Sequence, residues 1–260
     1  MSLRIASLAS GSKGNATLVL SDSTAILVDA GVCFTRIRKE LSRFGLTPSS
    51  LDGVVVTHEH SDHIAALPIL GRYAPVYAHP LTARAIAERQ GEVKGYREQD
   101  YYESGFIVGD IEVIPFRIPH DAAYPLGYTF RLSSGQQVSV ATDIGRPTVG
   151  VLNNIKDSEV VLLEANHDVE MLKKGSYPER LKRRILGDGG HLSNDMTAVF
   201  AEHLVGSAVR TLILGHLSQN NNLPELALGT VGDRLRRRGC TDIALSVASQ
   251  DAAGEVFEVK

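Results

Sequence analysis

Three imidazoles and one carboxylate follow a run of three valines near residue 55, and this stretch constrains the fold and the chemistry of the chain more than any other. The valines at 54–56 predict a short buried strand, because β-branched residues favour strands. Side chains alternate along an extended backbone, so His58 and His60 are expected on the same side of the chain as it leaves the sheet. Two imidazoles held in this way can bind one metal ion.

The residues that follow provide further ligands. Ser61 or Asp62 could cap a helix that begins near Ile64, and this start turns Asp62 and His63 toward the same space. The helix is expected to continue to Leu70 beneath the site. Packing does not readily explain three histidines and one aspartate within six residues at a strand end, so we expect a metal site here and not a solvated polar loop.

The composition of the 260 residues is that of an ordinary globular protein, and the net charge of -3 gives no sign of a generally basic surface. Cys33 and Cys240 lie far apart without the spacing of a zinc or redox motif, which favours a reducing cytoplasm. We find no secretion signal and no run long enough to cross a bilayer, so no membrane contact is expected. The oligomeric state is left open.

Alternating apolar runs and amphipathic segments predict one compact domain of mixed α and β structure over residues 1–260. Antiparallel strands are expected within 92–118, and helices near 178–186 and 194–205. Three further strands end in a side chain that can bind a metal: His120, Asp143 and His216.

These candidates can be sorted into two sets of ligands joined by one carboxylate. Three nitrogens can serve one ion: those of His58, His60 and His120. Three side chains can serve a second ion: Asp62, His63 and His216. Asp143 can bridge the two ions, and two ions about 3.5–4 Å apart would share a water, lower its pKa and favour hydrolysis. Serine or cysteine nucleophile motifs and a Walker sequence are missing from the chain.

The pattern His58-x-His60-x-Asp62-His63, continued by His120, Asp143 and His216, resembles the metallo-β-lactamase-fold hydrolase superfamily over most of the chain. The resemblance implies an α/β (α+β) fold, a four-layer αββα sandwich of two mixed sheets flanked by helices, with the metals at the sheet edge. Four further segments are similar to the YycJ/WalJ type of this superfamily: 10–15, 164–168, 190–194 and 215–222. Members of that type are described as cytoplasmic, manganese- or zinc-dependent nucleases, including 5′-to-3′ exonucleases linked to mismatch repair.

This resemblance implies a phosphodiesterase with two divalent ions, zinc or manganese with iron as a third option, that acts on single strands or 5′ ends of DNA in repair. Repair proteins are candidate partners. Two alternatives stay open. One is a small-molecule hydrolase of the same fold, such as a cyclic phosphodiesterase or a lactonase, and the other is a regulatory protein with structural metals.

Glu164 and His191 resemble the Glu–His pair of the ribonuclease Z branch, where the glutamate orients a histidine that touches the scissile phosphate. Leu163 stands where that branch has a histidine, and His167 follows three residues after the glutamate, so the proton donor is left open. A structural role for His191 or His167 is the alternative. The residues assigned to catalysis are Asp62, Asp143, Glu164 and His191.

Two segments could contact a phosphate-bearing substrate. The first is the glycine-rich turn at 10–15, although a turn of this kind is more often a simple hairpin connection. The second is the basic stretch Met171 to Arg184, which lies between Glu164 and His191 and could otherwise be a solvated helix face. The expected substrate contacts are His191, His167, Ser12, Lys13, Asn15, Lys182, Arg183 and Arg184.

Overall fold

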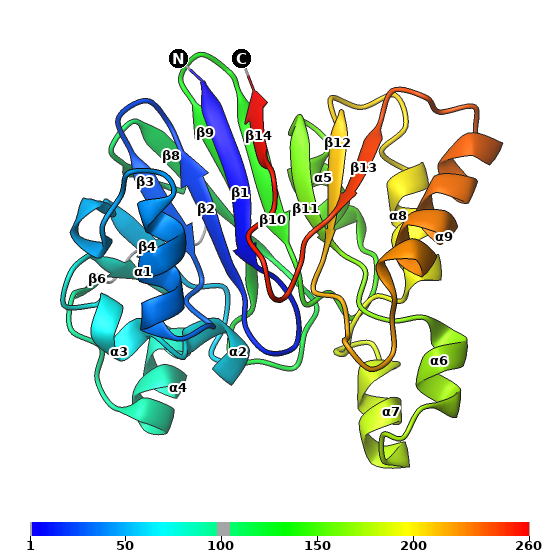
Figure 1. Ribbon diagram of the computed structural model, residues 1–260, viewed down its shortest axis with the longest axis horizontal. Helices are drawn as coiled ribbons and strands as arrows, with labels where there is room; N and C mark the ends of the chain where they lie inside the picture. Colours follow the sequence, from blue (N-terminus) through cyan, green and yellow to red (C-terminus); the bar gives the residue numbers. More distant parts are fainter. Residues whose placement is uncertain (1, 98–104, 260) are drawn as a thin grey trace.

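Two β-sheets packed face to face form the centre of the computed structural model, which describes residues 2–97 and 105–259 (Figure 1). Helices cover the outer faces, and this arrangement confirms the expected αββα sandwich of two mixed sheets. The first sheet has the strand order β14 (Val256–Val259), β1 (Leu3–Ala9), β2 (Ala16–Leu20), β3 (Ala25–Val28), β4 (Gly53–Val55), β5 (Val76–Tyr77) and β6 (Tyr96–Arg97). The second has the order β13 (Ala244–Val247), β12 (Thr211–Gly215), β11 (Val160–Glu164), β10 (Gln137–Ala141), β9 (Leu126–Leu132), β8 (Ile111–Arg117) and β7 (Phe106–Val108).

The helices divide between the two sides of the sandwich (Figure 1). Beside the first sheet lie α1 (Phe34–Ser42), the 3₁₀ turn η1 (Pro48–Ser50), α2 (Ser61–Ile64), α3 (Leu67–Leu70) and α4 (Pro80–Gln90). On the side of the second sheet lie α5 (Val149–Ile155), α6 (Val169–Lys174), α7 (Glu179–Ile185), α8 (Asn194–Glu202) and α9 (Pro224–Arg237). None of the helices in the described ranges has both the length and the apolar character that a bilayer span needs.

Alternate residues of the central strands pack into different apolar layers. Val55 of β4 lies between the sheets with Val28 and Phe130, whereas Val54 and Val56 face the helices outside the first sheet. A third layer fills the space between the second sheet and the helices α5, α8 and α9. Burial on both faces explains why the valine run at 54–56 is uniformly apolar, and it fixes the direction of the chain where β4 ends.

Parallel pairing brings the carboxyl ends of several strands to one edge of each sheet. The first sheet pairs β3, β4 and β5 in parallel, and the second pairs β10, β11, β12 and β13 in parallel. Polar side chains stand at or just after these ends: His58 after β4, Asp143 after β10, Glu164 at the end of β11 and His216 after β12. The strand-end positions predicted from the sequence are therefore correct.

Two local predictions were wrong or incomplete. The single helix expected from Ile64 to Leu70 is two short helices, and the first begins at Ser61 with His60 as its N-cap residue. The break arises because Pro68 has no N–H to donate to the preceding turn. Within 92–118, β7 and β8 are antiparallel as expected, but β6 pairs in parallel with β5, and residues 98–104 lie outside the described ranges.

Helix α6 was not predicted at all. It begins at Val169, just before the basic stretch, where the Asp168 carboxylate accepts a 2.8 Å hydrogen bond from Met171 N. This side-chain cap starts a helix of only six residues, too short for a recognisable apolar period.

Candidate metal centre

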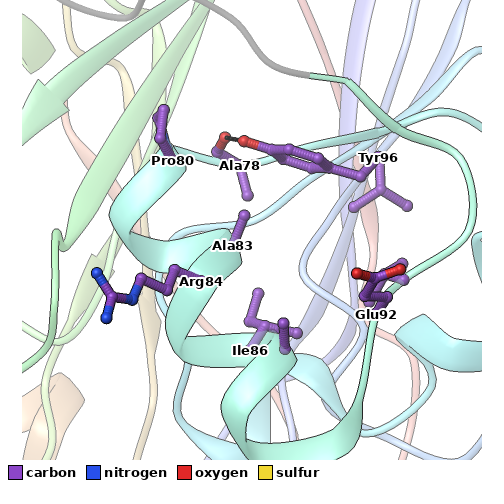
Figure 2. A pocket seen from close by; sticks show the side chains of 10 residues that line it. Ala78, Pro80, Ala83, Arg84, Ile86, Glu92 and Tyr96 are labelled. Atoms are coloured by element: carbon purple, nitrogen blue, oxygen red, sulfur yellow. Dashed lines mark hydrogen bonds between the residues drawn. The ribbon is translucent and has the colours of Figure 1, made fainter.

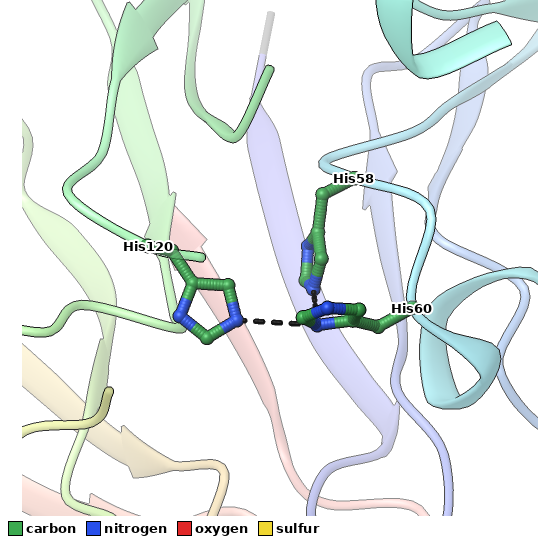
Figure 3. A group of neighbouring side chains, drawn as sticks. All are labelled: His58, His60 and His120. Carbon is green, nitrogen blue, oxygen red and sulfur yellow. Dashed lines mark hydrogen bonds between the residues drawn. The ribbon is translucent and has the colours of Figure 1, made fainter. Parts of the chain in front are cut away.

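Three imidazoles from two distant segments point toward one another at the edge of the sandwich (Figure 3). His60 Nδ1 lies 3.0 Å from His58 Nε2 and 3.2 Å from His120 Nε2. Their donor atoms all fall within 4.8 Å of one another, a spacing that one ion can bridge. The structure thus brings together the first set of nitrogens that the sequence indicated.

The second set of ligands lies beside the first, with Asp143 between them. Asp62 Oδ2 is 3.6 Å from His63 Nε2 and 3.4 Å from His216 Nε2. Asp143 reaches both sets, since its oxygens lie 3.3 Å from His63 Nε2 and 3.8 Å from His120 Nε2. Its Oδ2 is buried and has no hydrogen-bond partner in the part of the chain that the structure describes. A cation between the two sets would satisfy that oxygen.

The ionisation states of these groups fit a cation site. Burial lowers the pKa of His58, His60 and His120, which favours the neutral imidazoles that a metal ion would need. Burial also opposes the charge on Asp143, but His216 and the other imidazoles keep the pKa of this carboxyl below its usual value.

His63 and His216 behave differently in the metal-free protein. Burial works to lower the pKa of His63, but Asp143 and the other carboxylates around it outweigh burial and raise the value to about 9. The pKa of His216 is likewise raised, against burial, by Asp143 and its hydrogen-bonded carboxylates. These two imidazoles are thus protonated in the metal-free protein, and their positive charge balances the carboxylates around them. A bound cation would replace those protons.

Hydrogen bonds at Nδ1 fix the orientation of four of the imidazoles. Nδ1 of His58 contacts Thr57 Oγ1 at 2.9 Å, and Nδ1 of His63 contacts Asp29 Oδ2 at 2.7 Å. Nδ1 of His120 donates to the Gly190 carbonyl at 3.0 Å. In each case Nε2 is left for an ion, as is usual for histidines that bind metals. The fourth is His216, whose Nδ1 lies 3.0 Å from Glu164 Oε1.

Backbone strain marks the same places. Among the described residues other than glycine, three have a positive φ: Asp29 (61°), Asp143 (62°) and His216 (57°). Each follows the end of a strand that leads into the site. A left-handed backbone is unfavourable for such residues, and it is retained here where it turns the side chain toward the ligand cluster.

The short helix α2, which carries Asp62, is packed directly against the glycine-rich turn region. Asn15 N donates to Asp62 O at 2.8 Å, and a Cβ atom at Gly31 would lie only 1.6 Å from the same carbonyl. Asn15 Nδ2 also lies 3.2 Å from His63 Nε2. Asn15, expected to contact substrate, is buried and instead supports α2.

Glu164 connects the ligand cluster to His191. Its Oε1 lies 2.8 Å from His191 Nδ1, and its Oε2 accepts hydrogen bonds from the backbone N–H groups of Ile144 (2.6 Å) and Leu192 (3.1 Å). Burial works against the charge on Glu164, but His191 and His216 hold the pKa of this carboxyl well below its usual range. The paired arrangement of Glu164 and His191 expected from the sequence is therefore present.

A polar cavity of about 290 Å³ opens over these residues. Its lining includes ligands and His191, together with residues from α4 and α7 that stand on either side of it. The expected substrate contacts that line it are His191, Ser12 and Arg184. Arg184 is held there by Asp121, through contacts of 2.6 and 2.8 Å.

Several expected substrate contacts lie elsewhere. Lys13, Asn15, Lys182, Arg183 and His167 are not part of the cavity lining. The Lys182 ammonium donates to the Lys173 carbonyl at 2.7 Å and pairs with Glu179 at 3.1 Å, so it braces α7 against α6. The sequence pattern showed a basic segment but could not show which side of α7 faces the cavity.

His167 is enclosed beside the site. Its side chain is buried, its Nδ1 lies 3.3 Å from Asn166 Oδ1, and its Nε2 has no partner among the described residues. Burial lowers the pKa of His167 to about 4. These features favour a structural role over substrate contact.

Sequence reasoning missed several residues at the site. Asp29 and Thr57 hold ligands, and Arg89, Tyr177 and Asn166 line the cavity. Asp29 could have been found, because it follows β3 just as the other carboxylates follow their strands. Nothing in the local sequence marks Arg89 or Tyr177, since their positions depend on how α4 and α7 pack.

A second, larger cavity lies away from these groups, between α4 and the strands β5 and β6 (Figure 2). It measures about 380 Å³ and is lined mainly by apolar side chains, with Arg84 and Glu92 as its charged members. It contains none of the clustered imidazoles, so size alone does not identify the functional site.

Comparisons with known proteins agree with this geometry. A family model described as the beta-lactamase superfamily domain matches residues 24–217. The chain is 36% identical to exodeoxyribonuclease YycJ of Bacillus anthracis, a match that covers 100% of this chain and 95% of the relative. It is 35% identical to exodeoxyribonuclease WalJ of Streptococcus pneumoniae, a match that covers 97% of this chain and 96% of the relative.

Solved structures show the same fold at lower identity. The metallo-beta-lactamase fold protein YhfI from Bacillus subtilis superposes with a TM-score of 0.74 at 15% identity, over 100% of both chains. Unliganded yeast PDE1 gives a TM-score of 0.70 at 16% identity, over 97% of this chain and 99% of the other.

Proposed function

The chain belongs to the beta-lactamase superfamily, and from this premise we propose that it is a metal-dependent hydrolase that cleaves phosphodiester bonds in DNA. Its relatives of 35–36% identity are named exodeoxyribonucleases. The proposal extends to exonuclease action from the 5′ end of single strands, a role in DNA repair together with repair proteins, a cytoplasmic location and a single domain over residues 1–260.

The observation that carries the proposal is the position of Asp143 between two sets of ligands. We assign one divalent ion to His58, His60 and His120, and a second to Asp62, His63 and His216, with Asp143 contacting both. Nitrogen ligands suit Zn²⁺, whereas the carboxylates also suit Mn²⁺ or Fe²⁺. Bound ions of this kind polarise a phosphate and lower the pKa of an attacking water.

His191 is the proposed proton donor to the leaving oxygen. Its Nδ1 is held by Glu164 at 2.8 Å, so Nε2 is left for a substrate in the cavity that His191 lines. Glu164 is fully buried, and its four hydrogen-bond contacts keep the imidazole in one orientation. In this role Glu164 is a positioning residue, and His191 is the group that touches the phosphate.

The test is a nuclease assay with controlled metal content. Chelator-stripped protein is reloaded with Zn²⁺, Mn²⁺ or Fe²⁺ and mixed with single-stranded oligonucleotides labelled at either end. We expect products shortened progressively from the 5′ end, and no products from Asp143→Ala. Hydrolysis of bis(4-nitrophenyl) phosphate without cleavage of any oligonucleotide would support the small-molecule alternative instead. An Asp143→Ala variant that still replaces the native protein in cells would support the regulatory alternative.

A further inference from the structure

Arg89 stands on the wall of the metal-site cavity that faces α7. It belongs to the last turn of α4, and Figure 1 shows α4 and α7 on opposite sides of the lower edge of the molecule. The neighbouring Gln90 donates a 3.2 Å hydrogen bond to the Ile64 carbonyl at the end of α2, the helix that carries Asp62. The end of α4 is therefore tied to the ligand-bearing segment, and Arg89 has a defined place beside it.

The Arg89 guanidinium has no ion-pair partner among the described residues. Its side chain is exposed, and no carboxylate or carbonyl there pairs with it. Arg184, the other arginine of the cavity lining, already makes two hydrogen bonds to Asp121. Arg84, five residues earlier on α4, pairs with Glu88 at 3.1 Å and lines the apolar cavity of Figure 2. Of the two arginines that line this cavity, Arg89 is therefore the one whose guanidinium can bind an external anion.

We propose that Arg89 binds a phosphate of the DNA strand next to the scissile phosphate. A guanidinium matches the geometry of a phosphate and can donate two parallel hydrogen bonds to it. The scissile phosphate itself would lie at the ligand cluster and His191, so the cation on the α4 wall serves a neighbouring one. This inference rests on the proposed nuclease function, and it gives the site a reason to prefer strands over isolated phosphodiesters.

Three variants of the metal-loaded protein test the proposal. Arg89→Ala should lower kcat/KM on a single-stranded oligonucleotide by about 10- to 100-fold, mainly through KM, because a charge-assisted contact is lost. The loss should be at least ten times larger than on bis(4-nitrophenyl) phosphate, which has no neighbouring phosphate. Arg89→Lys should recover part of the activity. Arg84→Ala, on the same helix but facing the other cavity, is the matched control and should behave as the native protein does.

Salt dependence gives an independent measurement. Removal of one phosphate contact to a single strand should make the slope of log(kcat/KM) against log salt concentration shallower by about 0.7. Oligonucleotides with a 5′-phosphate or a 5′-hydroxyl show which phosphate is bound. A loss confined to the 5′-phosphorylated substrate identifies the terminal phosphate, and an equal loss on both identifies an internal one.

Two results would overturn the inference. One is native kinetics of Arg89→Ala on oligonucleotides, with an unchanged salt slope, while the native protein degrades DNA. The other is an equal loss on the oligonucleotide and on bis(4-nitrophenyl) phosphate, which would mean damage to the metal site. A native protein that cleaves no oligonucleotide under any metal would instead contradict both this inference and the proposed function.

Discussion

Asp29 holds His63 through a 2.7 Å contact between Oδ2 and Nδ1, in a pair that is almost completely shielded from solvent. Asp29 is itself fixed by Thr57, whose N–H and hydroxyl donate to its two oxygens at 2.8 and 2.9 Å. The carboxylate sets both the tautomer and the direction of the imidazole, so it would influence a bound ion without touching it.

Replacement of Asp29 by Asn should therefore weaken metal binding by about 10- to 100-fold, the usual effect of losing a carboxylate behind a metal-binding histidine. Competition with a fluorescent chelator measures the change. Asp52→Asn is the control, because the Asp52 carboxylate accepts from Ala25 N at the far end of β3 and should leave affinity unchanged. Equal affinities of Asp29→Asn and the native protein would show that the pair has no part in binding.

His191→Ala should lower kcat by about 10²- to 10⁴-fold, the range for loss of a general acid. The metal content should not change, because the imidazole is assigned to substrate and not to an ion. Elemental analysis and single-turnover kinetics on the same preparation separate these effects. His203→Ala, at the exposed end of α8, is the matched control. Loss of metal together with activity would reassign His191 as a ligand.

Binding of metal should raise the free energy of unfolding. At a free metal concentration 100 times Kd, the expected gain is about 2.7 kcal/mol. Urea unfolding with added metal and with chelator measures it. The gain should be smaller in Asp143→Ala, which lacks the carboxylate shared by the two sets of ligands. Identical unfolding midpoints with metal and with chelator would argue against a site in the native fold.

Acid should destabilise the metal-free protein partly through His167. Its pKa is about 4 in the folded protein and about 6.5 when unfolded, so the unfolded chain binds a proton first as the pH falls. This contribution to stability is complete above pH 6.5 and is lost between pH 6.5 and 4, with a total of about 3 kcal/mol.

Urea titrations at pH 7 and pH 4 measure the effect. His167→Asn should lose less stability than the native protein over this interval. His203→Asn, at an exposed position, should follow the native curve. Parallel curves for His167→Asn and the native protein would show that the imidazole is not held neutral by burial.

The sequence predicted which side chains gather at the candidate metal centre, because each of them carries a local signal. His58, His60, Asp62 and His63 lie within six residues, and His120, Asp143 and His216 each follow a strand, where sheet topology gathers side chains at one edge. Apolar patterning predicted a mixed α and β fold with a buried strand at 54–56, where the valines are indeed buried on both faces, whereas the αββα sandwich was implied by the family resemblance.

The surrounding residues could not be predicted in the same way. Arg89 in α4 and Tyr177 in the turn between α6 and α7 reach the cavity through tertiary packing, which no short motif encodes. The charges of Lys13, Lys182 and Arg183 suggested phosphate contact, but charge alone does not give direction, and none of the three lines the cavity. The helix start at Ser61 was missed because its N-cap residue, His60, makes no side-chain capping bond that a sequence motif would show.

Anomalous diffraction from crystals of the Mn²⁺- or Zn²⁺-loaded protein is the most direct test of the central claim. Two peaks are expected in each chain, one among His58, His60 and His120 and one among Asp62, His63 and His216, with Asp143 in contact with both. A single peak, or peaks remote from Asp143, would contradict the assignment of a two-ion centre.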